Sequence, residues 1–370
     1  MYMLPVISDN GQRLAALSET ALQQVVSGEV KTAVMIVVDG LGWANLKDRL
    51  AHAPNLRQLS RKRIETVAPS TTCAAITAFT TGVLPGQHGL IGYRIKNPST
   101  GTITKCLSDW GEIERVRDWQ PAETVFERAA EQDVNAYAIG RPNHAHGGFT
   151  RAVLTGAHYL PAATITDRFA EASELVRQDG SKLIYLYVDE LDRAGHKFGP
   201  DSNEWAYWLE QFDTALGDFL RSLPGGIGVL ITADHGMLQL DPAVTGRVLE
   251  DEGLTEGVEK VGGEPRFRML YLADPADAAE VTERLRNSER KNAWVGTRQD
   301  WISTGLWGSV ADEVARRIGD VVLVPRKRIL YMTRQEEPGM FNLLGHHGGF
   351  DDVERGVPVI TAGAFQPGQF

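Results

Sequence analysis

Carboxylates and imidazoles recur in this sequence at spacings that suit metal chemistry. Three aspartates and at least three histidines fall in four short motifs: Asp39 in VVDGLGW, Asp192 and His196 in DRAGHKFGP, Asp234 and His235 in TADHGM, and His346 and His347 in GHHGGFDD. Residues four apart share one face of a helix, and such nitrogen and oxygen ligands suit zinc. Adjacent histidines rarely bind one ion, so we expect a single ligand from the last motif. Each motif alone equally fits a helix cap or a hydrogen-bonded turn.

A cluster of hydroxyls adds a candidate nucleophile. The stretch VAPSTTCAAITAFTTG, residues 67–82, predicts a turn that leads into a helix, with Ser70, Thr71 and Thr72 at its start. Capping the helix needs only one hydroxyl, which leaves another free for chemistry. A bound metal makes a hydroxyl a usable nucleophile, and a helix N-terminus attracts an anion. Two metals about 4 Å apart need this inventory of ligands, and the combination is typical of phosphoryl transfer.

The elements around these motifs predict a parallel sheet. Near-continuous apolar runs at 32–38, 182–188 and 226–233 are typical of strands buried on both faces. Helical patterns at 123–132, 165–178 and 203–223 lie between them and indicate right-handed crossovers. The strands lead into Asp39, Asp189 and Asp234. Ligands bind beyond the carboxyl ends of such strands, so we expect the site at that edge.

The remaining segments complete the predicted architecture. Residues 1–240 and 331–370 form an α/β core with a mostly parallel central sheet and helices on both faces. Residues 241–330 form a small α+β insertion, with strands in RFRMLYLA and VVLVPRKRILY and helices in DPADAAEVTERLRN and SVADEVARRIG. The site motifs resume after the insertion, at LLGHHGGFDD.

Composition narrows the class of partner. The formal net charge of −10 argues against a nucleic acid polymer and against an anionic membrane as partners, although a local metal charge still permits a small phosphorylated ligand. Cys73 and Cys106 form no CxxC motif, which disfavours disulfides. The start of the sequence lacks the pattern of a signal peptide, and no apolar run is long enough to span a bilayer, so we expect a cytoplasmic protein.

The order of these motifs resembles the alkaline phosphatase superfamily, and most closely its type I phosphodiesterase/nucleotide pyrophosphatase branch. That branch has an Asp after the first strand, Pro-x-x-Thr, Asp-x-x-x-His-x-x-Gly-Pro, Asp-His-Gly-Met and a late His-Gly. The matching segments here are Asp39, Pro69–Thr72, Asp192–Pro200, Asp234–Met237 and His347–Gly348. The resemblance implies an alkaline phosphatase-like fold and hydrolysis of phosphodiester or pyrophosphate bonds of small molecules such as nucleotides.

The resemblance also implies roles for individual residues. Thr72 stands three residues after Pro69 and ten before Gly82, which makes it the nucleophile and Thr71 the runner-up. By resemblance, one Zn²⁺ is held by Asp192, His196 and His347, and a second by Asp39, Asp234, His235 and Thr72. Asp189 then becomes a neighbour, His347 is preferred over His346, and Mn²⁺ also suits the ligands. Thr72 is expected to form a phospho-threonine that water then hydrolyses.

One departure from the branch leaves the substrate open. Diesterases of this branch carry an asparagine shortly after the HG turn, where this sequence has Tyr93 and Arg94. Tyr93 can donate one hydrogen bond to a phosphate oxygen, whereas Arg94 can grip the dianion of a monoester. The alternatives are therefore a phosphomonoesterase or a phosphonoacetate hydrolase on the same scaffold, and a non-catalytic metal-dependent binding protein. We expect His144 and His146 in a loop near the pocket, with no metal role.

Overall fold

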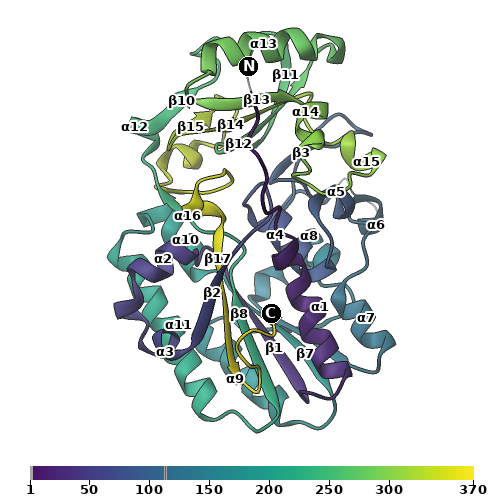
Figure 1. The fold of residues 1–370 in the computed structure, drawn as a ribbon, viewed down its shortest axis with the longest axis vertical. Coiled ribbons are helices and arrows are strands. Elements are labelled where there is room, and N and C mark those ends of the chain that lie inside the picture. Colours follow the sequence, from purple (N-terminus) through teal and green to yellow (C-terminus); the bar gives the residue numbers. More distant parts are fainter. Residues whose placement is uncertain (1–2, 112, 114) are drawn as a thin grey trace.

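The computed structural model describes residues 3–111, 113 and 115–370. A seven-stranded sheet forms its centre (Figure 1). The strands in sheet order are β2 (Ser60–Glu65), β17 (Gly356–Gly363), β8 (Ile227–Thr232), β1 (Thr32–Val38), β7 (Lys182–Val188), β5 (Asn135–Gly140) and β6 (His158–Pro161). The five strands from β8 to β6 run parallel, and β17 and β2 add an antiparallel edge. Strands β1, β7 and β8 are almost wholly buried, and their sequences are mainly apolar, with Thr32, Lys182 and Thr232 at strand ends.

Helices cover both faces of this sheet, which confirms the predicted α/β class. One layer contains α1 (Gln12–Val26), α4 (Thr72–Thr81) and α7 (Val125–Glu131), and the other contains α3 (Pro54–Gln58), α9 (Ile165–Arg177) and α11 (Asn203–Arg221) (Figure 1). The three strands predicted for this sheet and the crossover helices between them lie within two residues of the observed bounds, whereas the stretch 321–331, predicted as one strand, forms two strands, at Val321–Pro325 and Leu330–Met332. Capping boxes at Thr124 and Thr164 explain why α7 and α9 begin where they do.

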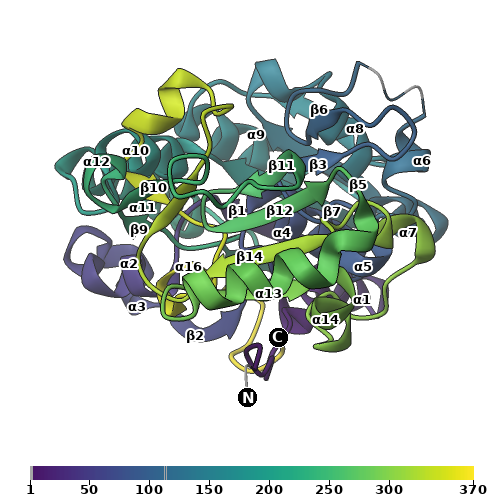
Figure 2. The same cartoon turned by 90° about the horizontal axis from the view of Figure 1, so that it is seen from above.

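A second, antiparallel sheet lies at one end of the molecule, beneath α13 (Ala278–Glu289) (Figures 1 and 2). Its order is β11 (Val258–Glu264), β12 (Phe267–Leu272), β14 (Val321–Pro325) and β13 (Ala293–Thr297). This sheet falls inside the predicted 241–330 insertion, whose limits stay a prediction. Phe267, Met269 and Trp301 pack in one apolar cluster with Cys73 and Ile76 of α4, so the second sheet is joined tightly to the core.

Shorter elements connect these sheets. The two-stranded pairs are β3 (Arg94–Lys96) with β4 (Ile103–Lys105), β9 (Leu238–Gln239) with β16 (Gly345–His346), and β10 (Gly246–Val248) with β15 (Leu330–Met332). The short α-helices are α2 (Trp43–Asp48), α5 (Pro85–His88), α6 (Val116–Trp119), α8 (Gly148–Val153), α10 (Glu190–Phe198), α12 (Pro242–Thr245), α14 (Arg298–Ser303), α15 (Asp312–Ala315) and α16 (Asp352–Arg355). The 3₁₀ helices are η1 (Leu50–His52), η2 (Pro142–His144), η3 (Pro275–Asp277) and η4 (Pro338–Asn342).

One helix prediction was too long. The helix expected in SVADEVARRIG forms only α15. The chain must then press against β12, since a Cβ at Gly319 would lie 2.7 Å from the backbone nitrogen of Leu270. Arg317 at the same point donates to the backbone carbonyls of Gly89 and Trp119. These tertiary contacts override the local helical pattern.

Two further predictions concern cysteines and membranes. Cys73 and Cys106 are both free and buried, as the absence of a CxxC motif suggested. Across the residues that the structure describes, none of the helices is long and apolar enough to cross a bilayer.

Candidate active site

The three hydroxyls at the start of α4 have three different surroundings. Thr71 is the N-cap residue, in an extended conformation, and its side chain makes no capping hydrogen bond. Ser70 Oγ donates to the Gly349 carbonyl at 3.0 Å. The expectation that one of these side chains caps the helix is therefore wrong. Thr72 Oγ1 lies 3.4 Å from Asp39 Oδ2 and 3.2 Å from His235 Nε2, so it faces the predicted metal ligands.

A buried cluster is formed by Asp39, Asp234 and His235. Asp39 follows β1 and Asp234 follows β8, and these strands are neighbours in the sheet, so their carboxyl ends meet. His235 Nε2 is 3.3 Å from Asp39 Oδ1 and 3.4 Å from Asp234 Oδ2. Gly236 lets the chain turn closely here, because a Cβ at this position would lie 1.9 Å from the Val353 carbonyl oxygen. Each of the three residues offers one candidate ligand atom, and these three atoms all lie within 4.8 Å of one another.

A half-buried cluster is formed by Asp192, His196 and His347, whose selected ligand atoms also lie within 4.8 Å of one another. Asp192 and His196 stand one turn apart on α10, with His196 Nε2 3.3 Å from Asp192 Oδ1. His347 comes from the loop after β16, and its Nε2 lies 3.3 Å from that of His196. The two clusters meet where the rings of His235 and His347 stack at 3.6 Å.

Backbone carbonyls orient all three imidazoles. Nδ1 faces Ser70 O in His347 and Gly345 O in His196, both at 2.8 Å, and Gly236 O in His235 at 3.2 Å. Each Nε2 is thereby turned toward its cluster, an arrangement typical of metal-binding histidines. His346 faces away, with Nε2 2.9 Å from Leu343 O, which agrees with the preference for His347.

The carboxylates carry the signature of a cation site. Asp39 Oδ1, Asp192 Oδ1 and Asp234 Oδ2 are buried and accept no hydrogen bond from any described residue. Burial raises the pKa of Asp39 well above its usual range, and the nearby Asp234 and Asp192 raise it further. Burial also raises the pKa of Asp192 and lowers that of His347. Carboxylate oxygens left without hydrogen-bond donors beside imidazole Nε2 atoms fit two divalent cations of the zinc or manganese type.

Asp189 has a different role from Asp192. Its carboxylate binds Arg141 Nε at 2.5 Å, and the same guanidinium reaches Glu190 at 2.7 Å. Arg168 also binds Glu190, through two nitrogens, so these charges neutralise one another beside the clusters. Asp189 is a neighbour of the candidate metal ligands although it stands directly at the end of β7.

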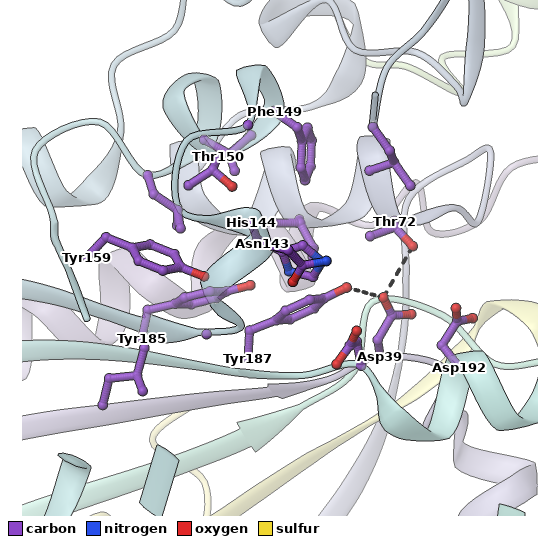
Figure 3. Close-up of a pocket in the computed structure, with 18 of the residues that line it drawn as sticks. Asp39, Thr72, Asn143, His144, Phe149, Thr150, Tyr159, Tyr185, Tyr187 and Asp192 are labelled. Atoms are coloured by element: carbon purple, nitrogen blue, oxygen red, sulfur yellow. Dashed lines mark hydrogen bonds between the residues drawn. The ribbon is translucent and has the colours of Figure 1, made fainter. Parts of the chain in front are cut away.

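A cavity of about 310 Å³ opens beside Thr72 and Asp39 (Figure 3). Tyr159, Tyr185 and Tyr187 form one wall, and Phe149 and His144 lie on the side of α8 and η2. Tyr187 donates a hydrogen bond to Asp39 Oδ2. Sequence reasoning placed His144 near the pocket but missed the tyrosines. The signal for Tyr185 and Tyr187 was the alternation in KLIYLYV, because residues two apart in a strand point to the same face.

Neither Tyr93 nor Arg94 is among the described residues that line this cavity. The Tyr93 backbone N–H donates to Glu264 Oε2 at 3.1 Å, and Arg94 Nη1 donates to Glu336 Oε2 at 2.9 Å. The predicted role of either side chain in substrate binding stays a prediction. His146 is exposed, on the loop that carries His144.

Residues 33–350 match the family described as type I phosphodiesterase/nucleotide pyrophosphatase. An uncharacterized pyrophosphatase/phosphodiesterase of Schizosaccharomyces pombe is 24% identical over 226 residues, or 56% of this chain. The chain spans only 44% of that relative's length.

Two solved structures share the fold. An inactive variant of murine ectonucleotide pyrophosphatase/phosphodiesterase 5, in complex with AMP, has a TM-score of 0.71 and 18% identity, and covers 89% of this chain and 87% of its own. Phosphonoacetate hydrolase from Sinorhizobium meliloti 1021, in complex with phosphonoformate, has a TM-score of 0.68 and 20% identity, and covers 90% of both chains.

Proposed function

For this chain, which belongs to the type I phosphodiesterase/nucleotide pyrophosphatase family, we propose a two-metal hydrolase that cleaves phosphodiester or pyrophosphate bonds of small molecules such as nucleotides. The observation that carries the proposal is the position of Thr72. Its hydroxyl lies against Asp39 and His235 of the buried cluster, and the half-buried cluster meets that one at the stacked rings of His235 and His347. A binding protein would have no need of a hydroxyl there.

The residues present suggest which groups hold the metals. Asp39, Asp234, His235 and Thr72 would hold one ion, and Asp192, His196 and His347 the other. Two bound divalent cations supply positive charge that stabilises a developing negative charge on phosphate oxygens and on the nucleophile. The orphaned carboxylate oxygens of both clusters support this assignment.

Thr72 performs the covalent chemistry in two displacements. Its Oγ1 attacks phosphorus, the bond from phosphorus to the leaving oxygen breaks, and the hydroxyl proton passes to Asp39 Oδ2, its hydrogen-bond partner. In the second displacement, water attacks the phospho-threonine, the bond from phosphorus to Oγ1 breaks, one proton of the water passes to Thr72 Oγ1, and the remaining OH stays on the released phosphate product. The N–H groups of Thr72 and Cys73 precede the first helical hydrogen bonds of α4, which run from Ala74 and Ala75 N–H to the Thr71 carbonyl, and they can bind the phosphate oxygens.

Two observations favour a diester over a monoester. The cavity beside Thr72 is walled by aromatic and aliphatic side chains, which suits an organic group on the phosphate. Arg94, the residue that would grip a dianion, is bound to Glu336. Phosphonoacetate hydrolysis and monoester hydrolysis remain the competing activities on this scaffold.

The test is a paired rate assay on zinc-loaded protein. Bis-p-nitrophenyl phosphate, p-nitrophenyl phosphate and phosphonoacetate are compared under one set of conditions, with Thr72→Ala as the blank for contaminating phosphatase. We expect a large preference for the diester. A preference for the monoester would favour Arg94 as a phosphate-binding residue. Turnover of phosphonoacetate alone would contradict the proposal and favour phosphonoacetate hydrolysis.

A further inference from the structure

The tip of the β11–β12 hairpin brings a buried arginine to the loop that carries His347. Arg266 Nε binds Glu354 Oε1 at 3.0 Å and Nη2 binds Oε2 at 2.7 Å. Both side chains are at least 98% buried. Arg266 Nη1 also donates to the carbonyls of Lys327 and Ile329, at 2.6 and 2.8 Å. The guanidinium is therefore fixed by four hydrogen bonds, two of them to Glu354 and two to backbone carbonyls of the predicted 241–330 insertion.

Glu354 connects Arg266 to the loop that carries His347 of the half-buried cluster. Its Oε1 accepts the Gly349 N–H at 2.9 Å, and its Oε2 accepts the Asp351 N–H at 3.1 Å. Gly349 is two residues from His347, and its carbonyl accepts Ser70 Oγ. A Cβ on Gly349 would lie 3.0 Å from Glu354 Oε2 and 3.1 Å from Arg266 Nη2, so the loop backbone presses directly on the ion pair.

Helix α16, which carries Glu354, also contacts the buried cluster, but through its backbone. The Glu354 carbonyl accepts the Gly236 N–H at 2.8 Å, next to His235. A side-chain substitution at Arg266 or Glu354 leaves this backbone bond available. Only the support of the His347 loop depends on the ion pair.

We propose that Arg266 is a positioning residue, which acts through Glu354 to hold His347 in place as a ligand of the half-buried cluster. The proposal rests on the two-metal function above. It gives the inserted segment a part in the site, because Arg266 is supplied by the tip of its hairpin. Outer partners of metal ligands typically change metal affinity by about 10- to 100-fold.

Arg268 offers a matched control on the same hairpin. It is also fully buried and ion-paired, with Glu336 as its partner and Tyr331 O as a second acceptor. Arg268→Met therefore removes a comparable buried charge without touching Glu354. Any general loss of stability should affect the Met variants at both positions.

The experiment measures Zn²⁺ affinity by chelator competition in wild type, Arg266→Met and Arg268→Met, and repeats it in an Asp192→Asn background. We expect Arg266→Met to weaken one of two ions by about 10- to 100-fold and Arg268→Met to weaken neither. In the Asp192→Asn background, which keeps only the buried cluster intact, Arg266→Met should change nothing. Equal weakening of both ions, or no weakening, would overturn the proposal.

A second variant guards against misfolding. Arg266→Lys keeps a positive charge but cannot bridge both carboxylate oxygens, so it should restore part of the affinity lost in Arg266→Met. An affinity for Arg266→Lys equal to that of wild type would overturn the requirement for the bidentate pair. The hydrolase proposal is judged separately, by turnover of the zinc-loaded wild type, so the two can fail independently.

Discussion

The two ligand clusters are built in different ways. Asp39, Asp234 and His235 follow adjacent strands of the central sheet, and each is no more than 2% exposed. In the other cluster, the side chains of Asp192 and His196 are 15% and 27% exposed, and His347 stands on a loop held by Arg266 and Glu354. The first cluster depends on strand ends in a buried sheet, and the second on a helix and a loop supported from the insertion.

This difference suggests a division of labour. Among the described residues of the two clusters, Thr72 is hydrogen-bonded to Asp39 and His235 of the buried one. The half-buried cluster is partly exposed, which the proposed second displacement would require. On the proposed mechanism, rigid placement would serve the nucleophile, and partial exposure would serve the attacking water.

The largest expected effect is from Thr72→Ala. Removal of a catalytic nucleophile lowers kcat by about 10³-fold or more, and the two bound ions should remain, because the other ligands are intact. Thr72→Ser should keep substantial turnover, and Thr71→Ala, one residue away, should keep most of it. Steady-state kinetics with metal analysis gives the answer. Activity lost in Thr71→Ala and kept in Thr72→Ala would move the nucleophile to Thr71.

The next largest effect is expected on metal content, and it distinguishes the two clusters as metal sites. Asp39→Asn and Asp192→Asn should each lower the content of tightly bound metal from two ions to one per chain. A chelator should remove the ion of the half-buried cluster first, because solvent reaches its ligands. Timed metal analysis of Asp192→Asn should then show only the slow phase. Two ions lost at one rate from wild type would contradict the distinction between the clusters.

A smaller effect is expected from Tyr187→Phe. This substitution keeps the ring in the cavity wall and removes only the hydrogen bond to Asp39. Burial, and then the negative charge of Asp39, raise the pKa of Tyr187 well above its usual range, so the phenol stays a donor. Hydrogen bonds to charged groups contribute about 1.5–3 kcal/mol, so we expect a loss of metal affinity of roughly 10- to 150-fold in the buried cluster. Isothermal titration should show that the affinity for the second ion is unaffected. Tyr159→Phe, which also removes a hydroxyl from the tyrosine wall, is the matched control.

The last effect is on stability, not on turnover or metal content, and it concerns the loop of the half-buried cluster. Glu264 packs against Gly348, and burial raises its pKa to about 8. The folded protein therefore binds a proton that the unfolded chain releases above pH 4.5, so this group's contribution to stability is lost as pH rises from about 4.5 to 8. Glu264→Gln should flatten that part of the pH dependence. Urea unfolding at pH 5 and pH 8 with chelator measures it, and parallel curves for the two proteins would refute the assignment.

Much of the buried cluster could be predicted from the sequence. Continuous apolar runs revealed β1, β7 and β8, and the residues after β1 and β8 had to meet at one sheet edge. The choice of Thr72 over its neighbours came from the resemblance to known phosphodiesterases, since local spacing left three hydroxyls open. The choice of Asp192 over Asp189 had the same origin.

The supports of the site could not be predicted in this way. Arg266 and Glu354 are 88 residues apart, and Arg94 and Glu336 are 242 apart, so no local pattern links them. In the sequence, the tyrosine wall was indicated only by the alternation of Tyr185 and Tyr187 in β7, a pattern that equally fits a strand of the hydrophobic core. Helix α15 ended early because of tertiary contacts at Gly319 and Arg317. Each of these features depends on which segments the fold brings together.

The most direct test of the central claim is acid-quenched peptide mapping by mass spectrometry during turnover of bis-p-nitrophenyl phosphate. The account predicts a p-nitrophenyl phosphoryl group on Thr72, present in wild type and absent from Thr72→Ala. An adduct on Thr71, or continued turnover with no adduct on either threonine in a quench that traps a phospho-threonine standard, would contradict it.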